Sequence, residues 1–100
     1  MKGQQEVKVV RLPRISDAEI VLGLNEVAHS RLKAVPISES EGHIAGEFVV
    51  VYPPGAPIII PGQRIRQEQI DYLLSIVEMG GDVVMLDPNK KMIYVVINDE

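Results

Sequence analysis

The chain has 100 residues, a formal net charge of −4 and no cysteine, which excludes disulfides and thiolate zinc sites. Its 46% hydrophobic residues can fill one core, and its 10 Lys and Arg residues form no basic stripe, so we expect no nucleic-acid partner. No apolar run approaches the ~20 residues of a membrane span, so we expect no membrane partner. The absence of cysteine fits a cytoplasmic location, which we also expect.

The N-terminus reads as a short polar lead followed by a strand. Residues 1–6 form a flexible lead without the apolar segment of a signal peptide. Residues 7–12, VKVVRL, have the composition of a strand, and Pro13 ends it. We therefore expect a single α+β domain over residues 7–100.

A first helix is predicted over residues 17–31. Ser16 followed by Glu19 has the spacing of a capping box, which begins a helix. Gly23 weakens the prediction, because glycine costs about 1 kcal/mol relative to alanine inside a helix. The apolar residues at helical spacing are Ile20, Leu24, Val27 and Ala28.

The middle of the chain is rich in β-branched residues. Residues 33–37 read as a short extended piece and residues 38–43 as a polar loop. Residues 44–52 and 57–60 read as two strands, the second nearly continuous in apolar residues, as a strand buried on both faces would be.

The second half predicts a helix and two strands. The helix covers residues 67–79, and Gly80 is its expected left-handed end. Strands follow at 82–86 and 92–97, joined by a turn with Pro88 at its second position and Asn89 at its third. The order β-α-β-β-β-α-β-β predicts two helices packed on a small mixed β-sheet, in the α+β class. The helix's apolar stripe is Ile70, Leu73, Leu74 and Val77.

Proline and glycine punctuate the two central strands. The motif positions are Tyr52, Pro53, Pro54, Gly55, Pro57, Pro61 and Gly62. Proline fixes φ and glycine takes the φ that the corner needs. Two interpretations stay open: a rigid joint that holds the 38–43 loop in register, or a tight structural corner with Tyr52 packed in the core.

The 38–43 loop holds the one cluster of proton-transfer groups, Glu39, Glu41 and His43. A carboxylate near an imidazole can do acid–base work, and two carboxylates can hold a cationic amine or guanidinium. The alternative is a solvated turn. His29 near the end of the first helix reads as a structural partner of the helix dipole.

Other catalytic frameworks are missing from the sequence. It has no Gly-x-Ser-x-Gly elbow, no glycine-rich phosphate loop before a helix and no HExxH spacing. We therefore expect no metal site and no cofactor site in this chain. The residues alone indicate a binding or structural module.

One longer stretch resembles a known family. Residues 41–65, EGHIAGEFVVVYPPGAPIIIPGQRI, resemble the C-terminal domain of the bacterial ornithine/lysine/arginine decarboxylases. The helix after Pro61-Gly62 and the closing hairpin also look like that family. Three positions depart from its pattern: His43 replaces the usual Arg, Ala56 the usual Ile, and Gln63 the usual Glu. Losing a permanent fork-shaped cation at position 43 puts the substrate's identity in doubt more than the fold.

The resemblance implies a role beside a catalytic domain. The family's enzymes decarboxylate basic amino acids with pyridoxal phosphate, whose lysine follows a histidine, and no lysine here does so. The resemblance thus implies no catalytic residue in this chain, a large cofactor-binding domain as its partner in cis or in trans, and a homo-oligomer. The candidates for lining the active-site mouth and for holding the distal cation of the substrate are Glu39, Glu41, Gly42 and His43.

Two other functions remain as alternatives. The chain could be a stand-alone binding or oligomerisation module of the same fold, for a basic amino acid or a polyamine. It could also be a complete small enzyme that uses Glu41 and His43 as an acid–base pair, although it lacks an oxyanion or metal element. The decarboxylase domain predicts an exposed apolar patch where the large domain docks, and the stand-alone module predicts none.

Overall fold

The computed structural model describes residues 19–52 and 55–97. The predicted lead 1–6, the strand 7–12, the capping residue Ser16 and the two prolines of the corner lie outside the described residues. In chain order the elements are α1 (Leu24–Ala28), β1 (Leu32–Pro36), the 3-10 helix η2 (Ile37–Glu39), β2 (Val49–Tyr52), β3 (Ala56–Ile59), α2 (Gln67–Glu78), β4 (Asp82–Val84) and β5 (Met92–Val96).

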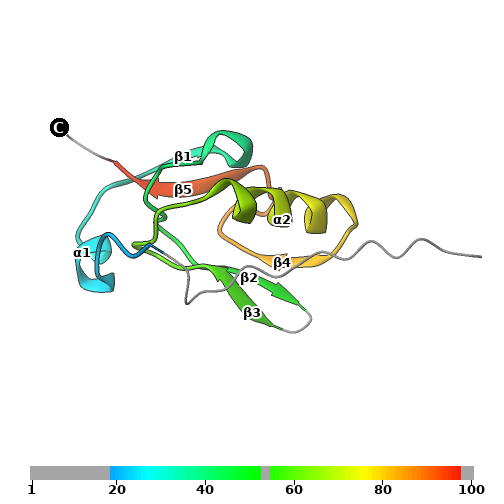
Figure 1. Cartoon of the computed structure of the whole chain (residues 1–100), viewed down its shortest axis with the longest axis horizontal. Coiled ribbons are helices and arrows are strands. Elements are labelled where there is room, and N and C mark those ends of the chain that lie inside the picture. The colour runs from blue at the N-terminus through cyan, green and yellow to red at the C-terminus, as the bar shows by residue number, and fades with distance from the viewer. Residues whose placement is uncertain (1–18, 53–54, 98–100) are drawn as a thin grey trace, which may run out of the picture.

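The α+β class is confirmed, and the described elements follow the predicted order. The described strands form two antiparallel sheets, β1-β5 and β3-β2-β4, where one mixed sheet was expected (Figure 1). The predicted strand 44–52 accounts for the difference, because it divides between the sheets. Ala45 bridges Val95 of β5, whereas Val49–Tyr52 pair with β3 and β4.

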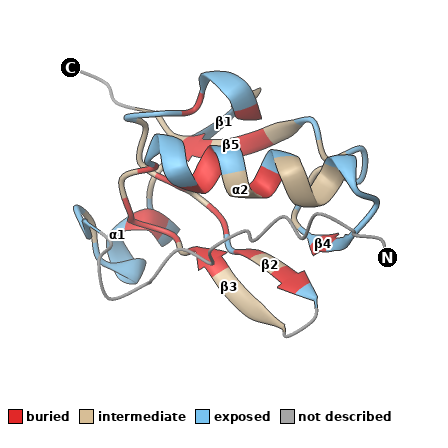
Figure 2. Ribbon diagram, turned by 45° about the vertical axis from the view of Figure 1, so that its right-hand side comes forward, coloured by how far each residue is buried: buried red, intermediate tan, exposed pale blue. Residues whose placement is uncertain are grey.

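The core lies between the two sheets and α2 (Figure 2). Ile70 and Leu73 of α2 are buried in it and Val77 packs against it, but Leu74, predicted for the same stripe, is 37% exposed. The core residues are mainly β-branched: Ile37, Ala45, Val49, Val51, Ile58, Ile59, Ile65, Ile70, Leu73, Val83, Ile93 and Val95.

The end of α2 forms as the sequence predicts. Gly80 has φ of +77° and donates its N–H to the carbonyl of Val77, and Gly81 donates to Ile76. These two bonds make a Schellman motif, which satisfies carbonyls that the helix itself leaves unpaired.

The first helix is much shorter than predicted. The prediction of residues 17–31 was wrong in extent, because α1 covers only Leu24–Ala28. The N–H groups of Val21 and Leu22 both bond to the carbonyl of Gly62, so this stretch is held extended by distant backbone. Gly23 is the N-cap, and the Glu26 carboxylate accepts its N–H.

The corner after β2 exposes its tyrosine. Tyr52 is 47% exposed, so of the two interpretations of the corner, the part that packs Tyr52 in the core was wrong. Gly55 has φ of +88° and donates to the carbonyl of Val51. Glycine at this position is therefore explained by a backbone conformation that other residues adopt at a cost.

The turn between β4 and β5 is organised by one carboxylate. Asp87 accepts the backbone N–H groups of Lys91, Asn89 and Met92 at 3.0, 3.0 and 2.9 Å. These bonds lower the pKa of Asp87 below its ordinary value of 3.8, and the bond from Lys91 has the largest effect. They favour the charged carboxylate of the folded protein.

A pH-dependent stability follows from this turn. Because the pKa of Asp87 is lower in the folded state, its contribution is complete above 3.8 and is lost as the pH falls through the folded-state value. We expect Asp87→Asn to be less stable than the wild type at pH 7, with the difference shrinking at pH 3. Urea unfolding at both values measures it, and a constant difference would contradict this origin.

Candidate functional site

A groove of about 520 Å³ lies beside the predicted 38–43 loop. It brings together charged side chains and apolar walls from four separate segments. Its lining residues, which define the groove below, are Val21, Leu22, Glu41, Gly42, His43, Ile44, Arg64 and Val96.

Backbone hydrogen bonds hold these four segments side by side. Residues 42–45 and 62–65 bond to each other: Gly42 donates to the Ile65 carbonyl and Ile65 to the His43 carbonyl, both at 2.9 Å. The 19–22 segment lies along the other side of 62–64, where Ile20 bridges Gln63. Residues 44–46 also bond to β5, so backbone hydrogen bonds connect the segments that line the groove.

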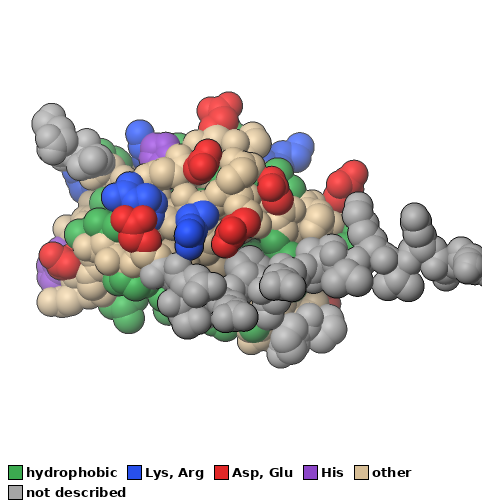
Figure 3. Space-filling model, viewed as in Figure 1, with side chains coloured by type: hydrophobic (Ala, Val, Ile, Leu, Met, Phe, Trp, Pro, Cys, Tyr) green, Lys and Arg blue, Asp and Glu red, His purple; other side chains and the backbone are tan. Residues whose placement is uncertain are grey.

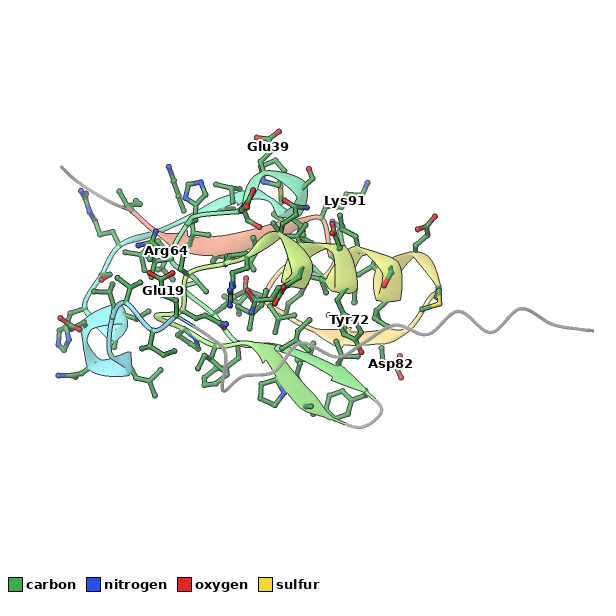
Figure 4. All side chains as sticks on the ribbon, in the orientation of Figure 1. Glu19, Glu39, Arg64, Tyr72, Asp82 and Lys91 are labelled. Atoms are coloured by element: carbon green, nitrogen blue, oxygen red, sulfur yellow. The ribbon has the colours of Figure 1, made fainter. Side chains whose placement is uncertain are left out.

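Arg64 is the best-fixed side chain of the groove. Its Nη1 donates to the carbonyl of Gly42 at 2.9 Å and its Nε donates to Glu19 Oε2 at 3.2 Å. Figure 4 shows the two charged side chains lying together at this end of the molecule. Both are well exposed, so the ion pair contributes little stability and its main effect is to orient the guanidinium.

Three of the four predicted site residues line the groove. Glu41, Gly42 and His43 belong to it, with Glu41 and Gly42 exposed and His43 half-buried. Glu39, the fourth, ends η2 and is absent from the lining (Figure 4). Gly42 adopts φ of +87°, which lets the chain reverse between its two neighbours.

The Glu41 side of the groove can take a cation with an apolar stem. Glu41 makes no hydrogen bond or ion pair with the described residues and is exposed, so its carboxylate can accept an ammonium or guanidinium group. The walls formed by Val21, Leu22, Ile44 and Val96 can contact a hydrocarbon stem beside it.

The second proline-glycine pair supports the groove from below. Gln63 is 1% exposed, and its Oε1 accepts the N–H of Ile60 at 3.0 Å, closing the turn through Pro61-Gly62. The departure of Gln63 from the family's Glu therefore falls on a buried turn, outside the lining of the groove.

Over residues 19–52 and 55–97, no three His, Asp or Glu side chains gather closely enough to hold a metal ion. Within those same ranges no helix combines the length and apolarity that crossing a bilayer requires.

Sequence reasoning did not single out Arg64, which it counted only among basic residues that form no stripe. Its partners Gly42 and Glu19 are 22 and 45 residues away in the chain. A usable signal was its position just after Pro61-Gly62, where a strand turns into a loop.

Comparisons of this chain with known proteins point to one family. A family model described as "Orn/Lys/Arg decarboxylase, C-terminal domain" matches residues 5–83. The chain is 34% identical over 77 residues to the arginine decarboxylase of Bacillus subtilis, a match that covers 77% of this chain and 15% of the relative. It is 40% identical over 52 residues to the lysine decarboxylase LdcA of Pseudomonas aeruginosa, covering 49% of this chain and 7% of the relative.

Solved structures share the fold. The lysine decarboxylase LdcF of Francisella novicida superposes with a TM-score of 0.66 at 24% identity, over 80% of this chain and 14% of that one. The constitutive lysine decarboxylase of E. coli gives 0.69 at 16% identity, over the same shares. The matched segments thus span between 7% and 15% of these four relatives. It belongs to the family of Orn/Lys/Arg decarboxylase C-terminal domains.

Proposed function

We propose that this chain works as the C-terminal domain of a pyridoxal-phosphate-dependent decarboxylase of a basic amino acid, with its groove beside the active-site mouth. The observation that supports this proposal most directly is the groove, where Glu41, Gly42 and His43 of the family-like segment lie beside Arg64. Glu41 attracts the distal cation of arginine, lysine or ornithine, and Arg64 holds the Gly42 backbone in place.

The chain's own residues do not fit the cofactor. Enzymes of this class hold pyridoxal phosphate through a lysine Schiff base, and no lysine lines the groove. The cofactor belongs in this proposal to the large domain of the parent enzyme, and the isolated chain is inactive. We also propose that the parent enzyme is a homo-oligomer.

A chimera tests the proposal. This chain would replace the matching C-terminal segment of the Bacillus subtilis arginine decarboxylase, and carbon dioxide release would be followed with arginine, lysine and ornithine. We expect the chimera to be active on at least one of them. A chimera that folds and assembles but decarboxylates none of the three would contradict the proposal.

The role assigned to Glu41 has a matched control in the same loop. In the chimera, Glu41→Gln is expected to raise KM about tenfold, because a charge-assisted hydrogen bond contributes about 1.5–3 kcal/mol. Glu39→Gln removes the same charge two residues away, outside the groove, and should leave KM unchanged. Equal effects of the two substitutions would show that only the overall charge matters.

A stand-alone binding module predicts a different result. In that case the chain would bind a basic amino acid or a polyamine by itself, and calorimetry with the isolated chain would detect it. Glu41→Gln would then weaken that binding without any large domain present.

A further inference from the structure

The outer face of the β3-β2-β4 sheet is apolar and exposed. Side chains alternate along β2 and β4, so that Val49, Val51 and Val83 enter the core and their neighbours point outward. The residues that define the outer face are Val50 and Tyr52 of β2 with Phe48 just before it, Val84 of β4 with Leu86 two residues after it, and Pro57 of β3.

These side chains form one surface. Val50 pairs with Val84 on one side and with Pro57 on the other, which makes a continuous apolar row across the three strands. Phe48, Val84 and Leu86 are 52%, 56% and 61% exposed. Monomeric domains seldom leave several large apolar side chains together in water, and such patches mark interaction surfaces.

The six residues that define the outer face carry no charge. Acidic and basic side chains appear on the face that Figure 3 shows. A charged residue, Asp82, borders the outer face, because it pairs with Tyr52 at the end of β2. Figure 4 places Asp82 at the opposite end of the molecule from Arg64 and Glu19.

The occupant can be argued from the length of the relatives. This chain covers only 15% of the Bacillus subtilis arginine decarboxylase and 14% of the Francisella novicida lysine decarboxylase. Most of such an enzyme therefore lies outside the part that this domain matches. An apolar face of this extent is what a domain presents to a larger one, whereas the groove also holds the charged side chains of Glu41 and Arg64.

We infer that the outer face is the surface on which the large domain of the parent decarboxylase packs, with a basic residue of that domain opposite Asp82. This inference rests on the proposed function and adds to it the surface used. The outer face and the groove share no residue, so docking through the outer face leaves the groove available. In this inference the outer face binds the large domain and the groove contacts the substrate.

Binding to a truncated relative tests the inference. The probe is the Bacillus subtilis arginine decarboxylase without its matching C-terminal segment, and surface plasmon resonance measures the Kd of the full 100-residue chain for it. We expect Val84→Lys to weaken binding at least tenfold. Met79→Lys is the matched control, because Met79 is 65% exposed but lies at the end of α2.

The outcomes separate the inference from the proposed function. Circular dichroism melting should show both variants as stable as the wild type, since each replaces an exposed side chain. If wild type and Val84→Lys bind equally well, the docking surface is overturned and the proposed function stands. If the wild type does not bind, both fail. Activity of the chimera gives a second readout, which Val84→Lys should lower and Met79→Lys should not.

Discussion

Gly62→Ala is expected to lower the free energy of unfolding by about 3–5 kcal/mol, the sum of backbone strain and steric overlap. Gly62 has φ of +92°, where a side chain is strained. A Cβ at this position would also overlap the carbonyl oxygen of Leu22. The 19–22 segment would have to leave the Gly62 carbonyl, to which it donates two hydrogen bonds, and the groove would lose one wall.

The matched control is Gly80→Ala. Gly80 also has a positive φ, +77°, but nothing lies within 4 Å of the position of its Cβ. Only the backbone strain remains, and we expect a loss of about 1 kcal/mol. Urea unfolding of the two variants measures the difference, and equal losses would show that the contact with Leu22 contributes nothing.

Glu47→Ala is expected to cost about 2–4 kcal/mol, because it leaves two backbone N–H groups without their acceptor. Glu47 is 5% exposed, and its two carboxylate oxygens accept the N–H groups of Leu86 and Tyr94, both at 2.8 Å. One side chain thereby joins the end of β4 to β5, across the two sheets. Unfolding in urea at pH 7 measures the loss.

Glu47→Gln separates the loss of an acceptor from the loss of side-chain volume. It keeps one acceptor and turns an amide NH₂ toward the other N–H, so its stability should lie between those of the wild type and Glu47→Ala. Glu41→Ala is the control for charge, since that carboxylate is exposed and its removal should change stability by no more than about 0.5 kcal/mol. A stable Glu47→Ala protein would contradict the joining role.

The sequence predicted elements whose signals are local. Helix α2 has its own apolar spacing and its own Gly80 ending, and β1 and β5 lie within one or two residues of their predicted bounds. The 17–31 helix failed because Val21 and Leu22 donate to Gly62, about 40 residues further along the chain, and no local pattern records such a bond. Strand 44–52 failed for a similar reason, since Glu47 within it turns inward to partners 39 and 47 residues away.

The same distinction explains the site. Glu41, Gly42 and His43 were found because they stand together in the sequence, and Glu39 was included because it stands beside them. Whether a loop residue faces a groove depends on what packs opposite. Here that is Arg64 and the 19–22 segment, which only the folded chain brings to the loop.

Reconstitution in trans tests the central claim most directly. The truncated Bacillus subtilis arginine decarboxylase would be mixed with this chain and pyridoxal phosphate, and carbon dioxide release from arginine, lysine and ornithine would be measured. The claim predicts that the mixture is active on a basic amino acid while each part alone is inactive. A folded chain that neither binds the large domain nor restores its activity would contradict the claim.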